Sequence, residues 1–154
     1  MKQQDTLQED LIQVYGLDIF GLSQEDMNRL PSASDDTAAV EDLRGTAPEA
    51  IEPLVPFLLV WFREMEAAIS LPLRDVLLAY PHRVISEVET VLADAGDDRW
   101  SANLLEHMVM PLPTDIQLQL KDALEDLIEY SENPRNPDRR HLLGIAKTIQ
   151  KAIS

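Results

Sequence analysis

The 154-residue sequence contains no cysteine, which excludes disulfides, thiolate nucleophiles and thiolate metal ligands within this chain. Glycine is scarce, at five residues, and aromatic residues make up only 5%. The longest apolar run, residues 54–62, contains Pro56 and is shorter than the roughly 20 residues that cross a bilayer as a helix. The first residues show no apolar run of the signal-peptide type, so we expect a cytoplasmic protein.

Basic residues are also scarce, because 13 Lys and Arg stand against 28 Asp and Glu, giving a formal net charge of −15. Residues 1–134 carry 27 acidic and eight basic residues, whereas residues 135–154 carry one acidic and five basic residues. A negative field repels nucleic acid and anionic membranes and speeds the encounter with basic proteins. The same composition is also consistent with a surface that is charged only for solubility.

No residue pattern typical of catalysis or of cofactor binding occurs. Phosphate-binding loops, nucleophile elbows, HExxH pairs and EF-hand spacings are all absent. The three histidines are far apart in the sequence: His82, His107 and His141. We therefore expect no enzymatic activity, no cofactor and no metal.

Two pairs of carboxylates, Asp35-Asp36 and Asp97-Asp98, each precede a predicted helix. Free N–H groups and the helix dipole favour carboxylates at that position, so we interpret both pairs as helix caps. A metal site or an acid–base pair is the alternative interpretation.

Three prolines, Pro48, Pro81 and Pro113, are separated by 33 and 32 residues and set the register of an internal repeat. Apolar residues recur three, seven, ten and eleven positions after each proline, which is the pattern of one helix face. A second apolar stripe lies eight, five and one positions before each proline. The residues eight positions before the prolines are Val40, Leu73 and Leu105. Those seven positions after are Val55, Val88 and Leu120, and those eleven positions after are Leu59, Leu92 and Leu124.

Each repeat is therefore predicted to be a helix, a turn with proline, and a second helix. Pro53 and Pro56 should bend the second helix of the first unit, and Arg44 interrupts its apolar register. Two pairs have the spacing of a capping box, namely Thr46 with Glu49 and Thr114 with Gln117.

These patterns predict an all-α protein, a HEAT-like α-solenoid of about three helical hairpins that bury their stripes against one another. Residues 1–30 are predicted to be an N-terminal helical extension, in which Ser23 caps a short helix. We expect the start of that extension to pack along the first hairpin through Leu7, Leu11 and Val14. Residues 31–154 form the repeat domain, which ends in a capping helix from Asp138 to Ile153.

The motifs resemble a bacterial domain family of unknown function with HEAT-like helical repeats. Its opening resembles Leu30-Pro31, Asp35-Asp36, Ala39-Val40-Glu41, Leu43-Arg44 and residues 48–54. Its middle resembles Asp97-Asp98-Arg99-Trp100, Asn103-Leu104-Leu105 and Pro111-Leu112-Pro113. The resemblance covers about residues 30–153 and implies the fold but no assigned activity. Some related small helical-repeat proteins sit beside toxin genes as immunity proteins, which is an analogy of fold alone.

Two sets of residues are candidates for binding a protein partner. Trp100 and Asn103 are one helical turn apart and could share a concave binding face, although core packing is the alternative for Trp100. Four acidic residues should lie on the polar side of one helix: Asp122, Glu125, Asp126 and Glu129. They form either a solvated face or a docking ridge for a basic partner.

We hypothesise a non-catalytic acidic protein-binding module and, most specifically, an immunity protein that neutralises a cognate bacterial toxin by binding a basic toxin domain. The alternative is an adaptor or scaffold repeat protein unrelated to toxins. A nucleic-acid glycosylase, an activity found on some HEAT-like folds, would need a basic groove, and the net charge of −15 opposes it. We expect neither nucleic acid nor membrane as partner, and the sequence leaves the oligomeric state open.

Overall fold

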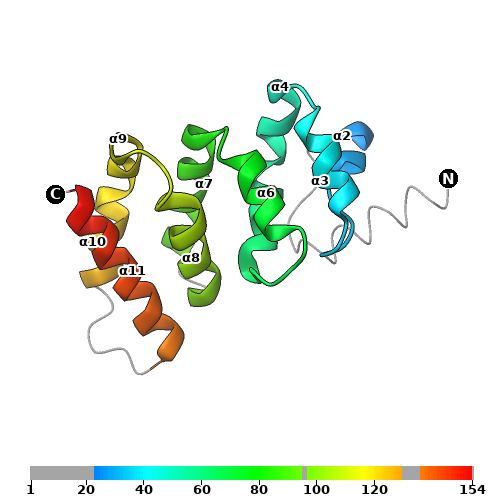
Figure 1. Cartoon of the computed structure of the whole chain (residues 1–154). Coiled ribbons are helices and arrows are strands. Elements are labelled where there is room, and N and C mark those ends of the chain that lie inside the picture. Colours follow the sequence, from blue (N-terminus) through cyan, green and yellow to red (C-terminus); the bar gives the residue numbers. More distant parts are fainter. Residues whose placement is uncertain (1–22, 95–96, 130–135, 154) are drawn as a thin grey trace.

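The computed structural model describes residues 23–94, 97–129 and 136–153. Within these ranges the protein is all-α, with α-, 3-10 and π-helical segments and no strand. The helices follow one another in a row, from α2 (Gln24–Arg29) at one end to α10 and α11 at the other (Figure 1). No helix in the described part of the chain is long and apolar enough to cross a membrane.

Most helices belong to one of two layers. The first layer holds the leading helix of each unit and the last helix of the chain: α3 (Thr37–Arg44), α6 (Ser70–Leu77), α8 (Asp98–Leu104) with the π-helix η3 (Leu105–Val109), and α11 (Pro137–Ile153). The second layer holds the segments that follow each turn: α4 (Pro48–Ile51), η1 (Glu52–Leu54), α5 (Val55–Leu58) and η2 (Leu59–Arg63); then α7 (Pro81–Asp94); then α9 (Thr114–Gln117), η4 (Leu118–Leu120) and α10 (Lys121–Glu129). Neighbours within each layer are in contact, for example α3 with α6 and α5 with α7.

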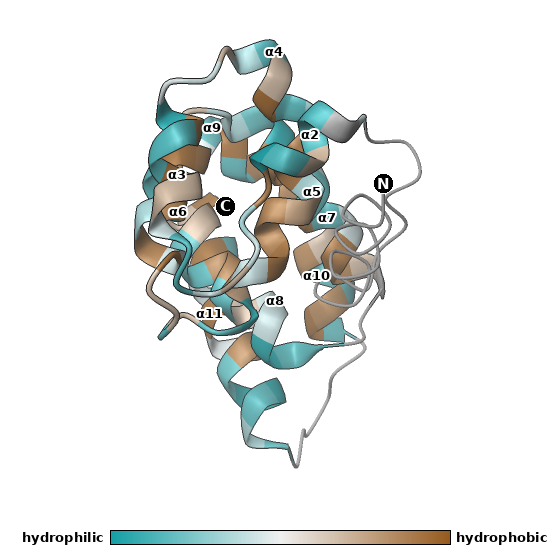
Figure 2. Ribbon diagram, turned by 90° about the vertical axis from the view of Figure 1, so that its right-hand side faces the viewer, coloured by the Kyte–Doolittle hydropathy of each residue, from teal (hydrophilic) through white to brown (hydrophobic). Residues whose placement is uncertain are grey.

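The apolar stripes predicted from the repeat form the core between the layers. The residues eight before, seven after and eleven after the repeat prolines are all buried. Full burial of a large aliphatic side chain contributes about 1.5–3 kcal/mol, so these stripes supply the main force that joins the helices. Hydrophobic and hydrophilic stretches alternate along single helices in Figure 2, as expected for helices with one buried face.

The predicted helix starts are largely confirmed. Pro48 and Pro81 are the first residues of α4 and α7, where a missing N–H costs nothing. The Asp36 and Asp97 carboxylates accept hydrogen bonds from the N–H groups of Ala39 (3.3 Å) and Trp100 (3.0 Å). The bond that Asp36 accepts from the Ser32 N–H is the largest cause that lowers its pKa, and partial burial opposes this effect. Ser23 forms a full capping box with Asp26.

Both capping boxes predicted beside the repeat prolines are wrong. The Thr46 hydroxyl donates to the Asp42 carbonyl oxygen at 2.8 Å instead, and no side chain caps α4. Gln117 is buried, and its amide nitrogen lies 2.9 to 3.2 Å from three backbone oxygens, those of Val109, Met110 and Leu112. These oxygens lie at the end of η3 and in the turn that follows it, so Gln117 bonds to the end of the previous helix rather than to the start of its own.

The second helix of the first unit, where Pro53 and Pro56 predict a bend, is divided into α4, η1, α5 and η2. Arg44 is exposed and forms an ion pair with Glu41 at 3.1 Å, which explains how the unit tolerates its charge. The C-terminal helix is present as α11 and buries Leu142, Ala146 and Ile149. The predicted packing of Leu7, Leu11 and Val14 lies outside the described residues.

Candidate binding surfaces

Trp100 and Asn103 lie together on α8 and contact η2 of the first unit. The half-buried Trp100 indole donates to the Leu59 carbonyl oxygen at 2.8 Å. The Asn103 amide donates to the carbonyl oxygens of Phe62 (2.8 Å) and Arg63 (3.3 Å). The structure therefore brings the pair onto one face, as predicted, but their polar groups serve contacts within the chain.

These contacts provide hydrogen-bond donors for carbonyl oxygens in the first unit. The end of a helix leaves carbonyl groups without partners, and an unpaired buried carbonyl costs about 1–3 kcal/mol. Ser70, fully buried at the start of α6, supplies two more contacts, since its hydroxyl lies 2.8 Å from the Glu64 oxygen and 3.2 Å from the Trp61 oxygen. Together Ser70, Trp100 and Asn103 form the carbonyl-capping group of η2.

Two charged side chains strengthen the same region. The Arg63 guanidinium carbon lies 4.7 Å from the centre of the Trp100 ring, in cation–π geometry. The Asp98 carboxylate accepts a hydrogen bond from Arg139 Nε of α11 at 3.2 Å and forms an ion pair with the same guanidinium at 3.0 Å. The stretch from Asp97 to Asn103 thus links the first unit, α8 and α11. A role for Trp100 and Asn103 in binding a partner stays a prediction.

The four acidic residues of α10 all lie on its solvent side. Asp122, Glu125, Asp126 and Glu129 are exposed, while Leu124 and Leu127 of the same helix are buried. Within the described ranges no hydrogen bond or ion pair to another residue is found for the four side-chain carboxylates. This set, the acidic ridge, therefore presents four carboxylates to solvent, and docking to it stays a prediction.

The acidic ridge belongs to a larger difference between the two layers. The second-layer segments, residues 48–63, 81–94 and 114–129, hold ten acidic and three basic residues, a net charge of −7. The first-layer helices α3, α6, α8, η3 and α11 hold six acidic and seven basic residues, a net charge of +1. Because the layers alternate along the chain, the charge blocks of the linear sequence did not reveal this segregation.

The structure also joins two histidines that are distant in the sequence. The nearest ring nitrogens of His107 and His141 each lie 3.8 Å from one Glu106 carboxylate oxygen. A hollow of about 400 Å³ between η3 and α11 adjoins Glu106 and His141, with the exposed Met110 on its rim. Sequence spacing carried no signal for this cluster. Among the described residues no group of three or more His, Asp or Glu could hold a metal ion.

The fold and these surfaces define a class of all-α proteins built from paired helices, here with its charge divided between two layers. Residues 29–149 match the family model described as a domain of unknown function (DUF5071), and the chain belongs to this family. Comparison with curated proteins gave no match. The resemblance to a domain family of unknown function is thereby confirmed over most of the chain.

Proposed function

We propose that this protein is a non-catalytic protein-binding module that captures a basic protein partner on its acidic second layer. The observation that carries the proposal is the division of charge, −7 against +1, between the layers. A charged surface needed only for solubility has no reason to be one-sided. Complementary charge raises the rate of encounter and selects against acidic partners.

The architecture we propose is a HEAT-like α-solenoid. The repeat spacing of 32 to 33 residues, the buried stripes and the contacts between successive leading helices support it. Such rows present long continuous surfaces, which suit protein partners better than small molecules. The acidic ridge lies near the end of the row in the second layer (Figure 1).

In its most specific form the proposal is an immunity protein that neutralises a cognate bacterial toxin by direct binding. A toxin with a basic active surface, such as a nuclease, would complement the acidic ridge in sign. An adaptor or scaffold unrelated to toxins would use the same surface for a different basic protein.

Co-purification with the tagged full chain from its native cells, first at low and then at high salt, tests the proposal. We expect one dominant basic partner that high salt weakens. A variant that neutralises the ridge (Asp122→Asn, Glu125→Gln, Asp126→Asn, Glu129→Gln) should lose about tenfold or more in affinity. A matched first-layer variant (Glu41→Gln, Asp42→Asn, Asp75→Asn, Glu106→Gln) should lose about twofold or less, because these four carboxylates lie on α3, α6 and η3 and not on α10.

The identity of the partner separates the two forms. A toxin whose lethality is relieved when this chain is expressed with it supports the immunity form. A housekeeping partner supports the adaptor form. Absence of any partner at low salt, or equal loss in both variants, contradicts binding by the acidic layer.

A further inference from the structure

The two helices at the end of the row carry opposite net charges. α10 holds four acidic residues and one basic residue, a net charge of −3. α11 holds one acidic residue and four basic residues, a net charge of +3. The helices are in contact and run in opposite directions (Figure 1), so an acidic strip and a basic strip lie side by side.

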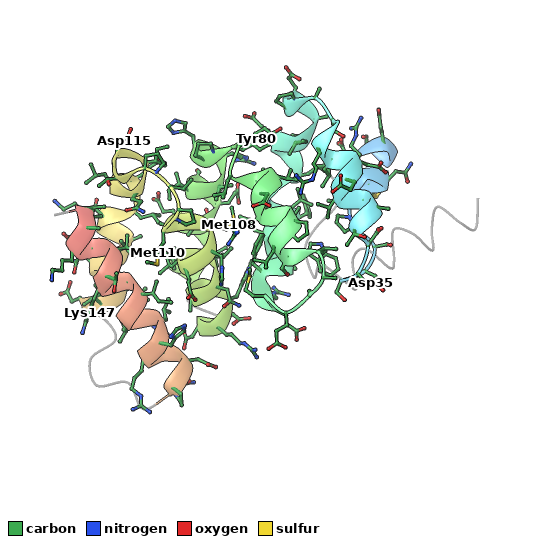
Figure 3. The ribbon with its side chains drawn as sticks, viewed as in Figure 1. Asp35, Tyr80, Met108, Met110, Asp115 and Lys147 are labelled. Atoms are coloured by element: carbon green, nitrogen blue, oxygen red, sulfur yellow. The ribbon has the colours of Figure 1, made fainter. Side chains whose placement is uncertain are left out.

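The basic strip lies on the outside of α11. Arg140, Lys147 and Lys151 are exposed, and their spacing of seven and four residues places them along one helix face. Figure 3 shows Lys147 at the outer edge of the row. A hollow of about 360 Å³ separates the strips, with Lys121 and Glu125 on the α10 side and Lys147 and Lys151 on the α11 side.

We propose that this end of the protein is the interface of a homodimer with two-fold symmetry. In a two-fold interface, a contact between residue i of one copy and residue j of the other copy occurs twice. The patch must therefore be complementary to itself. Rotation about an axis through the hollow would set the acidic ridge of each copy against Arg140, Lys147 and Lys151 of the other. An acidic strip beside a basic strip satisfies that condition in sign.

The charge of the whole molecule opposes association, since each copy carries −15. Over α10 and α11 together the net charge is zero, so this patch avoids local repulsion. Charges further away are screened beyond a Debye length of about 8 Å at physiological salt. A second-layer face placed against another second-layer face would bring like charges together.

The remaining first-layer helices, α3, α6, α8 and η3, hold five acidic and three basic residues, a net charge of −2, and they lack separate strips. On these helices opposite charges stand beside each other on the same helix, as Arg44 does with Glu41 at 3.1 Å and Arg74 with Asp75 at 3.8 Å. The α10–α11 end is therefore the surface best suited to self-association.

The size of the patch predicts a weak dimer. Two helices about 10 Å wide, of which α10 is about 14 Å long and α11 about 26 Å, offer on the order of 400 Å² per copy. Stable interfaces bury about 800 Å² per partner, so the dimer should dissociate at low concentration and be sensitive to salt.

Sedimentation velocity on the purified full chain tests this inference without any other partner, so its result is independent of the proposed function. In about 0.1 M salt, charges in direct contact are only weakly screened. The apparent mass of the wild-type protein should then rise with protein concentration, from 17.4 kDa for the single chain toward twice that mass. In about 1 M salt the protein should stay a single chain. Two double variants should each abolish this rise in apparent mass. One is Glu125→Lys with Asp126→Lys, and the other is Lys147→Glu with Lys151→Glu.

Mixing these two variants provides the decisive result, because the reversed strips of one complement those of the other and a mixed dimer should form. Two control variants change the total charge by the same amount at positions outside α10 and α11, and their self-association should stay within about twofold of wild type. They are Glu87→Lys with Glu89→Lys, and Arg44→Glu with Arg99→Glu. Circular dichroism identifies any variant that fails to fold. A wild type that stays single at all concentrations, or a mixture that stays single, overturns the inference.

Discussion

The segment 48–63 and helix α7 occupy the same place in successive repeats, yet their backbones differ. α7 is one continuous helix of 14 residues, whereas the first-unit segment changes between α and 3-10 geometry. Ser86 and Glu89 stand in α7 where Pro53 and Pro56 stand in the first unit. Both segments still bury the same stripe, Val55 and Leu59 in one and Val88 and Leu92 in the other.

The difference shows that the core specifies which face is buried and not how the backbone pairs. Beyond the two prolines, side chains from other parts of the chain donate to carbonyl oxygens of residues 59–64. Trp100 and Asn103 do so across 40 or 41 residues and Ser70 across six to nine. The first unit therefore depends on its neighbours for polar contacts, whereas α7 pairs its own backbone.

The largest effect on stability should come from placing a proline in α7 at the position that corresponds to Pro53 of the first unit. Ser86→Pro removes a hydrogen bond from the middle of a continuous helix of 14 residues and clashes with the preceding turn. We expect a loss of about 3 kcal/mol or more in the free energy of unfolding, measured by urea denaturation. Ser86→Ala, at the same exposed position, should change it by about 0.5 kcal/mol or less.

The next largest effect should follow removal of the buried hydroxyl that serves the first unit. Ser70→Ala leaves the Glu64 and Trp61 carbonyl oxygens without that donor, and we expect a loss of about 2 kcal/mol. A loss below about 0.5 kcal/mol would mean that water replaces the hydroxyl. Hydrogen exchange of the amides in η2 should show whether the loosening is local.

Trp100→Phe keeps an aromatic ring, although a smaller one, and removes the indole donor to the Leu59 carbonyl oxygen. A loss of about 1 kcal/mol is expected, with faster amide exchange in residues 59–63 than in α7. Equal acceleration in both segments would contradict the dependence of the first unit on α8.

Replacing the first-unit proline with its α7 counterpart should have a small effect. Pro53→Ser restores an N–H group at an exposed position and raises the entropy of the unfolded chain, so we expect a loss of about 0.5–1 kcal/mol. A gain in stability would show that the proline itself strains the segment.

Tyr80, where α6 leads into α7 (Figure 3), reports electrostatically on the first-unit segment. Burial raises the pKa of its phenol above 10.0, and the carboxylates of Glu49 and Glu52 raise it further. The folded state then holds this proton more tightly, so its contribution to stability is complete below pH 10 and is lost as pH rises through the folded pKa. Ultraviolet titration against Tyr80→Phe should show this late ionisation, and Glu49→Gln with Glu52→Gln should move it earlier.

Particular residues show how far sequence reasoning reached. Val40, Leu73 and Leu105 were assigned to the core from spacing alone, and all three are fully buried. The caps at Asp36 and Asp97 were also predictable, because a cap bonds to a backbone group three residues away. Gln117 was assigned to the wrong helix end, since its true partners lie upstream at the end of η3.

For the candidate surfaces the division is similar. The acidic ridge follows from helix period, so sequence placed its four carboxylates on one side of α10. The segregation of charge between layers, the meeting of His107 and His141 at Glu106, and the strips of α10 and α11 required the arrangement of helices in space.

The sequence by itself determined the all-α class, the register of the repeat and the buried stripes, because these depend on the 3.6-residue period and on contacts within a few residues. The tertiary structure alone decided that Trp100 and Asn103 satisfy η2, that Asp98 pairs with Arg139, and that opposite charges meet at one end of the row. Those partners lie some 40 residues apart or on different helices. Which of them meet depends on how the helices pack, because no local period relates residues so far apart in the chain.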